Sequence, residues 1–69
     1  MNKFPERLKE LREEKGLTQR ELGKRVGTSG QNISRWEKGE KMPTLNSIIP
    51  LCIFFGCSSD YLIGLKDEG

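Results

Sequence analysis

Histidine is absent from this chain of 69 residues, and cysteine, tryptophan and tyrosine are scarce. Without histidine, the chain lacks the commonest general base of enzyme active sites. Its two cysteines, Cys52 and Cys57, are too few for a zinc site. Both lie in or beside an apolar segment, which favours reduced thiols in the core. We therefore expect no enzymatic activity, no metal site and no cofactor.

Long apolar runs are also missing. No stretch approaches the roughly 18 residues that a membrane-spanning helix needs. The N-terminal segment 1–10 is charged where a signal peptide would have its apolar core. The sequence therefore predicts a cytoplasmic protein without a membrane partner. Its length and balanced composition favour a single globular domain, 1–69, with a frayed tail at 65–69.

Positive charge is concentrated in the middle of the chain. The formal net charge is only +2. Residues 18–41, however, hold six Lys or Arg against three Glu, a net charge of +3. Residues 42–69 hold one Lys against three acidic residues, a net charge of −2. Such a basic segment suits a surface that faces phosphate groups.

Helix start and stop patterns recur at short intervals. Apolar residues lie three and four positions apart, Pro5 suits a first helical turn, and Thr or Ser precedes four of the segments as an N-cap. Glycine follows each segment as a helix terminator. No segment alternates with the period of two of a half-buried strand. The chain is therefore expected to be all-α, with short helices at about 4–15, 19–26, 30–38, 45–55 and 59–63.

The segment 18–38 carries the most specific pattern. Its two helices are joined by the short turn Gly27-Thr28-Ser29. Gly23 provides the small side chain needed where steeply crossing helices approach, and Gly27 can adopt the positive φ that so short a turn requires. The apolar positions tie both helices to a shared core. They are Leu22, Val26, Ile33 and Trp36. This spacing predicts a helix-turn-helix.

Residues 17–39, LTQRELGKRVGTSGQNISRWEKG, resemble the XRE family of phage and bacterial regulators, the lambda-repressor and Cro type. The likeness extends from about Arg7 to Leu65. It implies a compact five-helix bundle whose third helix enters the major groove of double-stranded DNA, with homodimers on near-palindromic operators. It also implies a sequence-specific transcriptional regulator, a repressor in particular. The alternative is a protein-binding module, such as an antitoxin-type domain, on the same fold.

The third predicted helix has two opposed faces. At 100° per residue, Ile33 and Trp36 share the core face, so Trp36 is expected to pack there rather than stack on a base. Arginine pairs well with guanine O6 and N7, and glutamine with adenine N6 and N7. On the polar face we therefore expect Gln31 and Arg35 to read bases, with Ser34 as a lesser contact.

Phosphate contacts are expected on both sides of this helix. By resemblance, Gln19 occupies a phosphate-contacting position at a helix N-terminus, where main-chain amides favour an anion. On the other side, Lys38, Lys41 and the main-chain amides from Gly39 to Lys41 are the expected partners. Ser29 is a further candidate, although its role as an N-cap would explain it alone.

The resemblance gives Arg12 and Glu37 a different role. In family members the matching residues form a buried ion pair between the first and third helices, and the same structural bridge is expected here. Homodimerisation is expected to use the end of the fourth helix and the fifth helix, although some of these apolar residues must belong to the core. The candidates are Phe54, Phe55, Tyr61, Leu62, Ile63 and Leu65.

Two residues depart from the expected pattern. Gly30 lies where family members often carry a base-reading side chain, so one reading position is empty. Pro50 falls beyond the first turn of the fourth helix, where its ring and missing N–H disrupt a helix. It predicts a kink, or a helix that starts later than residue 45.

Overall fold

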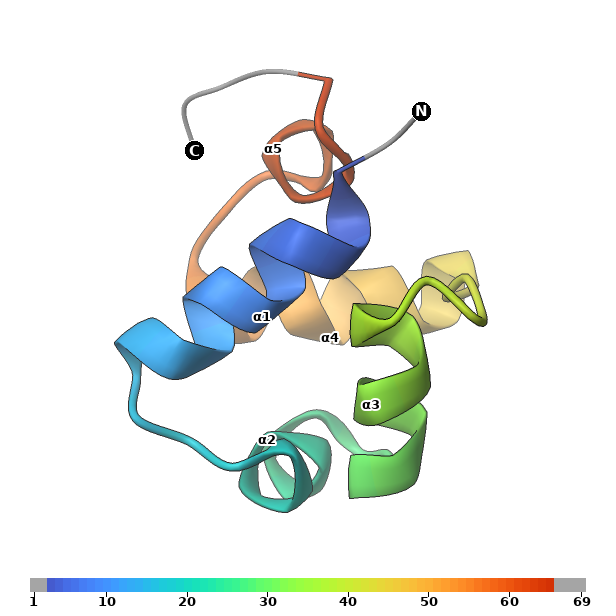
Figure 1. Cartoon of the computed structure of the whole chain (residues 1–69). Coiled ribbons are helices and arrows are strands. Elements are labelled where there is room, and N and C mark those ends of the chain that lie inside the picture. Colours follow the sequence, from blue (N-terminus) through green and yellow to red (C-terminus); the bar gives the residue numbers. More distant parts are fainter. Residues whose placement is uncertain (1–2, 66–69) are drawn as a thin grey trace.

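The computed structural model describes residues 3–65, and within them the chain forms five α-helices and no strand. The helices are α1 (Phe4–Glu14), α2 (Gln19–Val26), α3 (Gly30–Glu37), α4 (Leu45–Phe55) and α5 (Ser59–Ile63) (Figure 1). The all-α, five-helix prediction is confirmed. Only α1 and α3 end one residue earlier than predicted. The expected fraying of the tail falls almost wholly outside the described residues.

Side-chain caps begin three of the helices. Thr18 Oγ1 accepts a hydrogen bond from the Glu21 amide at 3.0 Å, and Glu21 Oε1 accepts one from the Thr18 amide at 2.8 Å. This reciprocal pair is the predicted capping box, and it lowers the pKa of Glu21. Ser29 and Ser58 cap α3 and α5 through their hydroxyl groups. Thr44 occupies the N-cap position of α4, but its side chain makes no capping bond.

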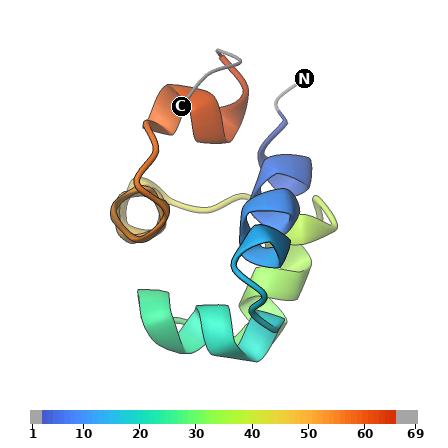
Figure 2. The same ribbon diagram turned by 90° about the vertical axis from the view of Figure 1, so that its left-hand side faces the viewer.

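All five helices contribute to one apolar core. α2 and α3 pack against each other, α1 packs on α3 and α5, and α4 packs on α2 and α5 (Figures 1 and 2). The buried apolar side chains are Phe4, Leu8, Leu22, Ile33, Trp36, Ile48, Leu51 and Leu62. Full burial of one such aliphatic side chain contributes about 1.5–3 kcal/mol. The core thereby fixes α2 and α3 in place and leaves their outer faces to solvent.

α4 runs without interruption from Leu45 to Phe55 and includes Pro50. The alternative of a later helix start is therefore wrong. Figure 2 views α4 along its axis, and the turns of the helix superpose as a single ring, so α4 shows no marked bend along its length. Proline removes one amide donor, which leaves the carbonyl of Asn46 without its usual partner in the helix. Asn46 is exposed, so water can satisfy that carbonyl.

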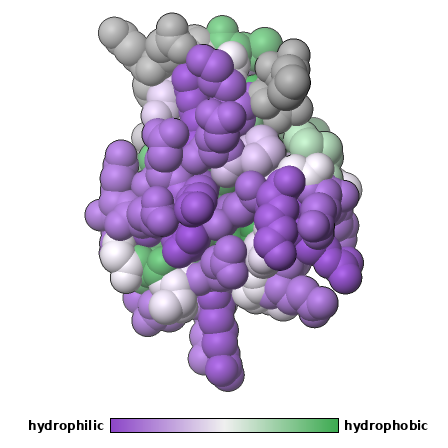
Figure 3. All heavy atoms as spheres, viewed as in Figure 1, coloured by the Kyte–Doolittle hydropathy of each residue, from purple (hydrophilic) through white to green (hydrophobic). Residues whose placement is uncertain are grey.

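Polar side chains dominate the face formed by α1, α2 and α3 (Figure 3). None of the helices in residues 3–65 has the length and apolar character needed to cross a bilayer. Even α4, which is almost wholly apolar, has only 11 residues.

Candidate nucleic-acid interface

The crossing of α2 and α3 depends on Gly23. A Cβ atom at this position would lie 2.8 Å from both the Ser29 carbonyl carbon and the Thr28 carbonyl oxygen. The Gly23 carbonyl also accepts a hydrogen bond from the Thr28 amide at 2.8 Å. Gly27 ends α2 with φ at 80°, in the left-handed region. The glycine requirements predicted for this turn therefore follow from its backbone geometry.

Gly30, the first residue of α3, is equally close to α2. A Cβ atom here would lie 2.8 Å from Arg20 Cα and 2.9 Å from Arg20 N. These are main-chain atoms near the start of α2, and only movement of one helix would relieve the overlap. Gly30 is thus more than a missing base-reading side chain, because it allows the two helices to approach this closely.

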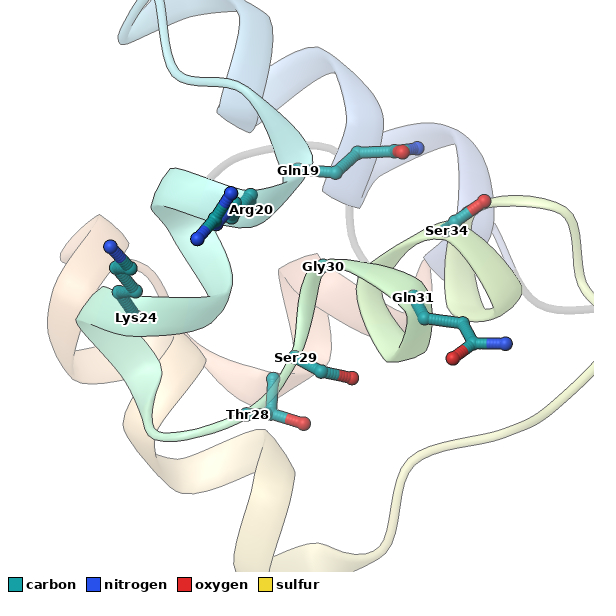
Figure 4. A pocket seen from close by; sticks show the side chains of 8 residues that line it. All are labelled: Gln19, Arg20, Lys24, Thr28, Ser29, Gly30, Gln31 and Ser34. Carbon is teal, nitrogen blue, oxygen red and sulfur yellow. The ribbon is translucent and has the colours of Figure 1, made fainter.

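The residues predicted to read bases lie together on the outer face of α3. Gln31 and Arg35 are exposed and Ser34 is half-buried. No hydrogen bond or ion pair within residues 3–65 engages these three side chains. Figure 4 shows Gln31 and Ser34 on the α3 side of an open hollow, with Arg20 and Lys24 on the α2 side. This polar face is therefore available to a partner.

Two hollows flank the start of α3. The larger has a volume of about 600 Å³ and lies between α2 and α3. Its lining residues are Gln19, Arg20, Lys24, Thr28, Ser29, Gly30, Gln31 and Ser34. The smaller, about 220 Å³, brings Arg35 and Lys41 to one depression with Ser29 and Gln31. Both hollows therefore combine basic groups with hydrogen-bonding side chains.

The predicted phosphate-contacting residues differ in their exposure and in the hydrogen bonds that they already make. Lys38 and Lys41 are exposed beyond the last turn of α3. Ser29 Oγ already accepts the capping bond at 3.1 Å, but its hydroxyl hydrogen remains a possible donor. The amide of Gly39 donates to the Trp36 carbonyl at 3.1 Å. The C-terminus of α3 therefore already engages the Gly39 amide, and its expected contact with phosphate stays a prediction.

Glu40 shows the same use of its amide, which donates to the Arg35 carbonyl at 3.0 Å. The main-chain amides after α3 are thus mostly engaged in ending the helix. Lys41 is the one residue of this expected group whose amide makes no hydrogen bond within the described part of the chain.

A carboxylate network connects the first three helices. Arg12 Nε donates to Glu37 Oε2 at 2.6 Å and Arg12 Nη2 donates to Glu37 Oε1 at 3.0 Å. Arg12 Nη1 also donates to the Leu17 carbonyl at 2.8 Å. The two side chains are only 13% and 4% exposed, and the hydrogen bonds to Glu37 raise the pKa of Arg12. The pair therefore has the interhelical position that the resemblance implied.

Gln19 joins this network, which sequence reasoning did not anticipate. Its Nε2 donates to Glu37 Oε1 at 3.2 Å. A side-chain amide has two hydrogens, and Glu37 takes only one of them. The other hydrogen remains available for an external acceptor. Glu37 therefore orients the Gln19 side-chain amide and leaves it one free donor.

A family model described as helix-turn-helix matches residues 8–62 of the chain. The chain belongs to this family of helix-turn-helix transcriptional regulators, the Cro and C1 type. Among its relatives, the HTH-type transcriptional regulator ImmR of Bacillus subtilis is 36% identical over 62 residues. Repressor protein C2 of Salmonella phage P22 is 38% identical over 58 residues. This family is one of regulators rather than enzymes.

Solved structures of the family share the same fold. The P22 c2 repressor protein, crystallised in complex with a synthetic operator, has a TM-score of 0.83 and 37% identity, covering 87% of this chain and 91% of that one. A transcriptional regulator from Listeria innocua has a TM-score of 0.89 and 26% identity, covering 100% of this chain and 64% of that one. The alignment with ImmR includes 90% of this chain and 48% of ImmR. The alignment with the P22 repressor includes 84% of this chain and 27% of that repressor.

The single tryptophan of this helix-turn-helix domain lies in the core. Trp36 is 2% exposed and meets Phe4 edge to face, with ring centroids 6.3 Å apart. Within residues 3–65, its indole N–H has no hydrogen-bond partner. The expectation that Trp36 packs in the core rather than facing a base agrees with this burial.

The cysteines offer no metal site. Cys52 and Cys57 are half-buried free thiols, and burial raises the pKa of both. Within residues 3–65, no group of three or more His, Cys, Asp or Glu side chains is placed to hold a metal ion.

The exposed apolar residues only partly coincide with the residues considered for a dimer interface. Of the residues considered for a dimer interface, Leu62 is fully buried and only Leu65 is strongly exposed, at 73%. The larger exposed set lies on one side of α4, spaced four residues apart. It comprises Leu45, Ile49 and Ile53, exposed by 71%, 50% and 76%. Because α4 is apolar all round, its sequence did not reveal which side faces solvent.

Proposed function

We propose that this domain is a sequence-specific reader of double-stranded DNA in a cytoplasmic transcriptional regulator, and that the regulator is a repressor. The observation that carries the proposal is the unpaired polar face of α3, which lies beside two hollows with basic rims. An α-helix fits the major groove, where each base pair presents a distinct set of donors and acceptors. The P22 c2 repressor, in complex with an operator, supports this use of the shared fold.

Arg35 and Gln31 are the proposed base-reading residues, with Ser34 as a lesser contact. Both larger side chains are exposed and unpaired on α3. The guanidinium of Arg35 can donate two hydrogen bonds to guanine, and the amide of Gln31 can pair with adenine. Each bidentate contact of this kind contributes about 1–3 kcal/mol of discrimination.

The proposed phosphate contacts are Gln19, Ser29, Lys38, Gly39 and Lys41. Gln19 has one free amide hydrogen at the N-terminus of α2, where unpaired main-chain amides also favour an anion. Ser29 keeps its hydroxyl donor, and the two lysines are exposed at the other end of α3. Such contacts hold the domain on the duplex without reading its sequence.

A homodimer on a near-palindromic operator completes the proposal. α3 has only eight residues and reads few base pairs by itself. Two copies related by twofold symmetry read two half-sites about 34–36 Å apart. The exposed apolar row on α4 supports association, because a second copy can cover it.

Selection of bound sites from a random duplex library tests this function directly. The wild-type chain is expected to enrich one near-palindromic site. Arg35→Ala is expected to relax the preference at one position in each half-site and to leave the others unchanged. Enrichment of no site by the wild-type chain would contradict the proposal.

The same apolar row on α4 also favours a second candidate, a domain whose main partner is another protein. Salt dependence separates the two functions. Duplex binding through phosphate contacts weakens steeply as salt rises, because counterions are released on binding. Failure to bind any duplex at low salt would favour the protein-binding module.

A further inference from the structure

We propose that Arg20 is a further specificity-determining residue, which reads a base next to the position where α3 has no side chain. This inference rests on the proposed DNA-reading function, because it adds a base contact to the same surface. Neither the resemblance nor the helical pattern of α3 points to Arg20, which belongs to α2.

Gly30 and Arg20 lie in direct contact where α3 begins. A Cβ atom at residue 30 would lie 2.8 Å from Arg20 Cα and 3.2 Å from Arg20 Cβ. The Cα and Cβ atoms of Arg20 therefore lie directly against the first residue of α3. The Arg20 main chain occupies the space that a side chain at residue 30 would need, so glycine is required there and α3 presents no side chain beside Arg20 at this point.

The hollow between α2 and α3 places Arg20 beside the proposed base-reading face. Arg20 and Gly30 both line it, together with Gln31 (Figure 4). The proposed base-reading face of α3 and the Arg20 side chain therefore open onto one continuous surface. A base edge that approaches Gln31 also approaches the space beside Arg20.

The side chain of Arg20 is available to a ligand. Its neighbours in the first turn of α2 are both engaged, since Gln19 bonds Glu37 and Glu21 bonds the Thr18 amide. Arg20 is exposed, and its guanidinium makes no hydrogen bond or ion pair within the described residues. Lys24, one turn later on the same hollow, offers no acceptor. Among residues 19–21, Arg20 is thus the one whose side chain makes no hydrogen bond within the described residues.

The chemistry of the guanidinium decides the ligand. A planar fork of donors matches O6 and N7 of guanine, whereas the ammonium of a lysine contacts an anion as a point charge. Next to an empty reading position, the Arg20 fork therefore takes a guanine of the half-site, and Lys24 at the outer rim remains near the phosphates.

Site selection with matched variants tests this assignment. The full 69-residue chain is used as wild type, Arg20→Lys, Arg20→Ala and Lys24→Ala, with helix content checked by circular dichroism. Wild type is expected to prefer guanine at one position per half-site that Arg35→Ala does not relax. Both Arg20 variants are expected to lose that preference by about 5- to 150-fold, which corresponds to the 1–3 kcal/mol of a bidentate contact. Lys24→Ala is expected to weaken all sites alike.

Two results would overturn the inference while the proposed function survives. In the first, wild type selects a site and the Arg20 variants select it with the same preference at every position. In the second, Arg20→Ala weakens all sequences equally and Arg20→Lys restores binding, which is the behaviour of a phosphate contact. If wild type enriches no site, the proposed function itself is contradicted and this inference fails with it.

Discussion

Glu37 accepts the side-chain amide of Gln19 at 3.2 Å through Oε1, the same oxygen that pairs with Arg12 Nη2. One carboxylate on α3 therefore holds a residue of α1 and the first residue of α2. Since Gln19 is a proposed phosphate contact, the network that stabilises the fold also orients part of the DNA-binding surface. Stability and DNA affinity are thereby linked through Glu37.

Removal of the Glu37 carboxylate is expected to be strongly destabilising. In Glu37→Ala, the guanidinium of Arg12 stays largely buried without its anion, and loss of one partner of such a pair costs about 3–5 kcal/mol. Chemical denaturation followed by Trp36 fluorescence measures the change. The double variant Arg12→Met with Glu37→Met is expected to recover much of the loss, because it strands no charge. A single variant as stable as wild type would show that the pair contributes little.

Alanine at Gly30 is expected to destabilise the domain, against the ordinary preference of helices for alanine. That preference favours alanine by about 1 kcal/mol in a helix interior and by less at a first residue. The added Cβ atom would lie 2.8 Å from the Arg20 main chain, and overpacking of this kind costs about 1–3 kcal/mol. The overlap is therefore expected to outweigh the propensity.

Thermal unfolding of Gly30→Ala measures this balance. Lys24→Ala, an exposed change on α2 beside the same hollow, is the control and is expected to stay within about 0.5 kcal/mol of wild type. A Gly30→Ala domain more stable than wild type would mean that α2 and α3 can separate at little cost.

The helix bounds could be predicted from the sequence because their causes are local. The capping box of Thr18 and Glu21 lies within four residues, and glycine terminators act on the turn just before them. The bond between Gln19 and Glu37 could not be predicted in this way, because it depends on how α2 and α3 cross. The same is true of the overlap at Gly30, since no periodicity within α3 reports its distance from Arg20.

The solvent-exposed side of α4 could not be predicted from the sequence for another reason. Polar residues normally mark the solvent face of a helix, and α4 has almost none. Only the packing of α4 on α2 and α5 shows that the row containing Ile49 and Ile53 faces outward.

The capping box at α2 predicts a pH-dependent contribution to stability. Hydrogen bonds from Thr18 lower the pKa of Glu21 below its ordinary value of 4.5. A lowered pKa means that the stabilisation is fully present above the unfolded-state pKa and is lost as the pH falls through the native value. Glu21→Gln is therefore expected to flatten the stability profile below about pH 4.5. Thr18→Ala should cost about 1 kcal/mol at neutral pH. Identical acid profiles for Glu21→Gln and wild type would exclude a role for this carboxylate.

The row Leu45, Ile49 and Ile53 on α4 allows dimerisation to be tested without damage to the core. Ile53 is 76% exposed, so Ile53→Lys is expected to change the stability of the monomer by no more than about 0.5 kcal/mol. If a second copy covers this row, the lysine places like charges across the twofold axis and removes apolar contact. Binding to a two-half-site duplex is then expected to weaken, whereas binding to a single half-site is expected to stay the same. Lys9→Ala on the exposed surface of α1 is the matched control. Equal weakening on both duplexes would instead place Ile53 at the DNA, and no change on either would remove α4 from the dimer interface.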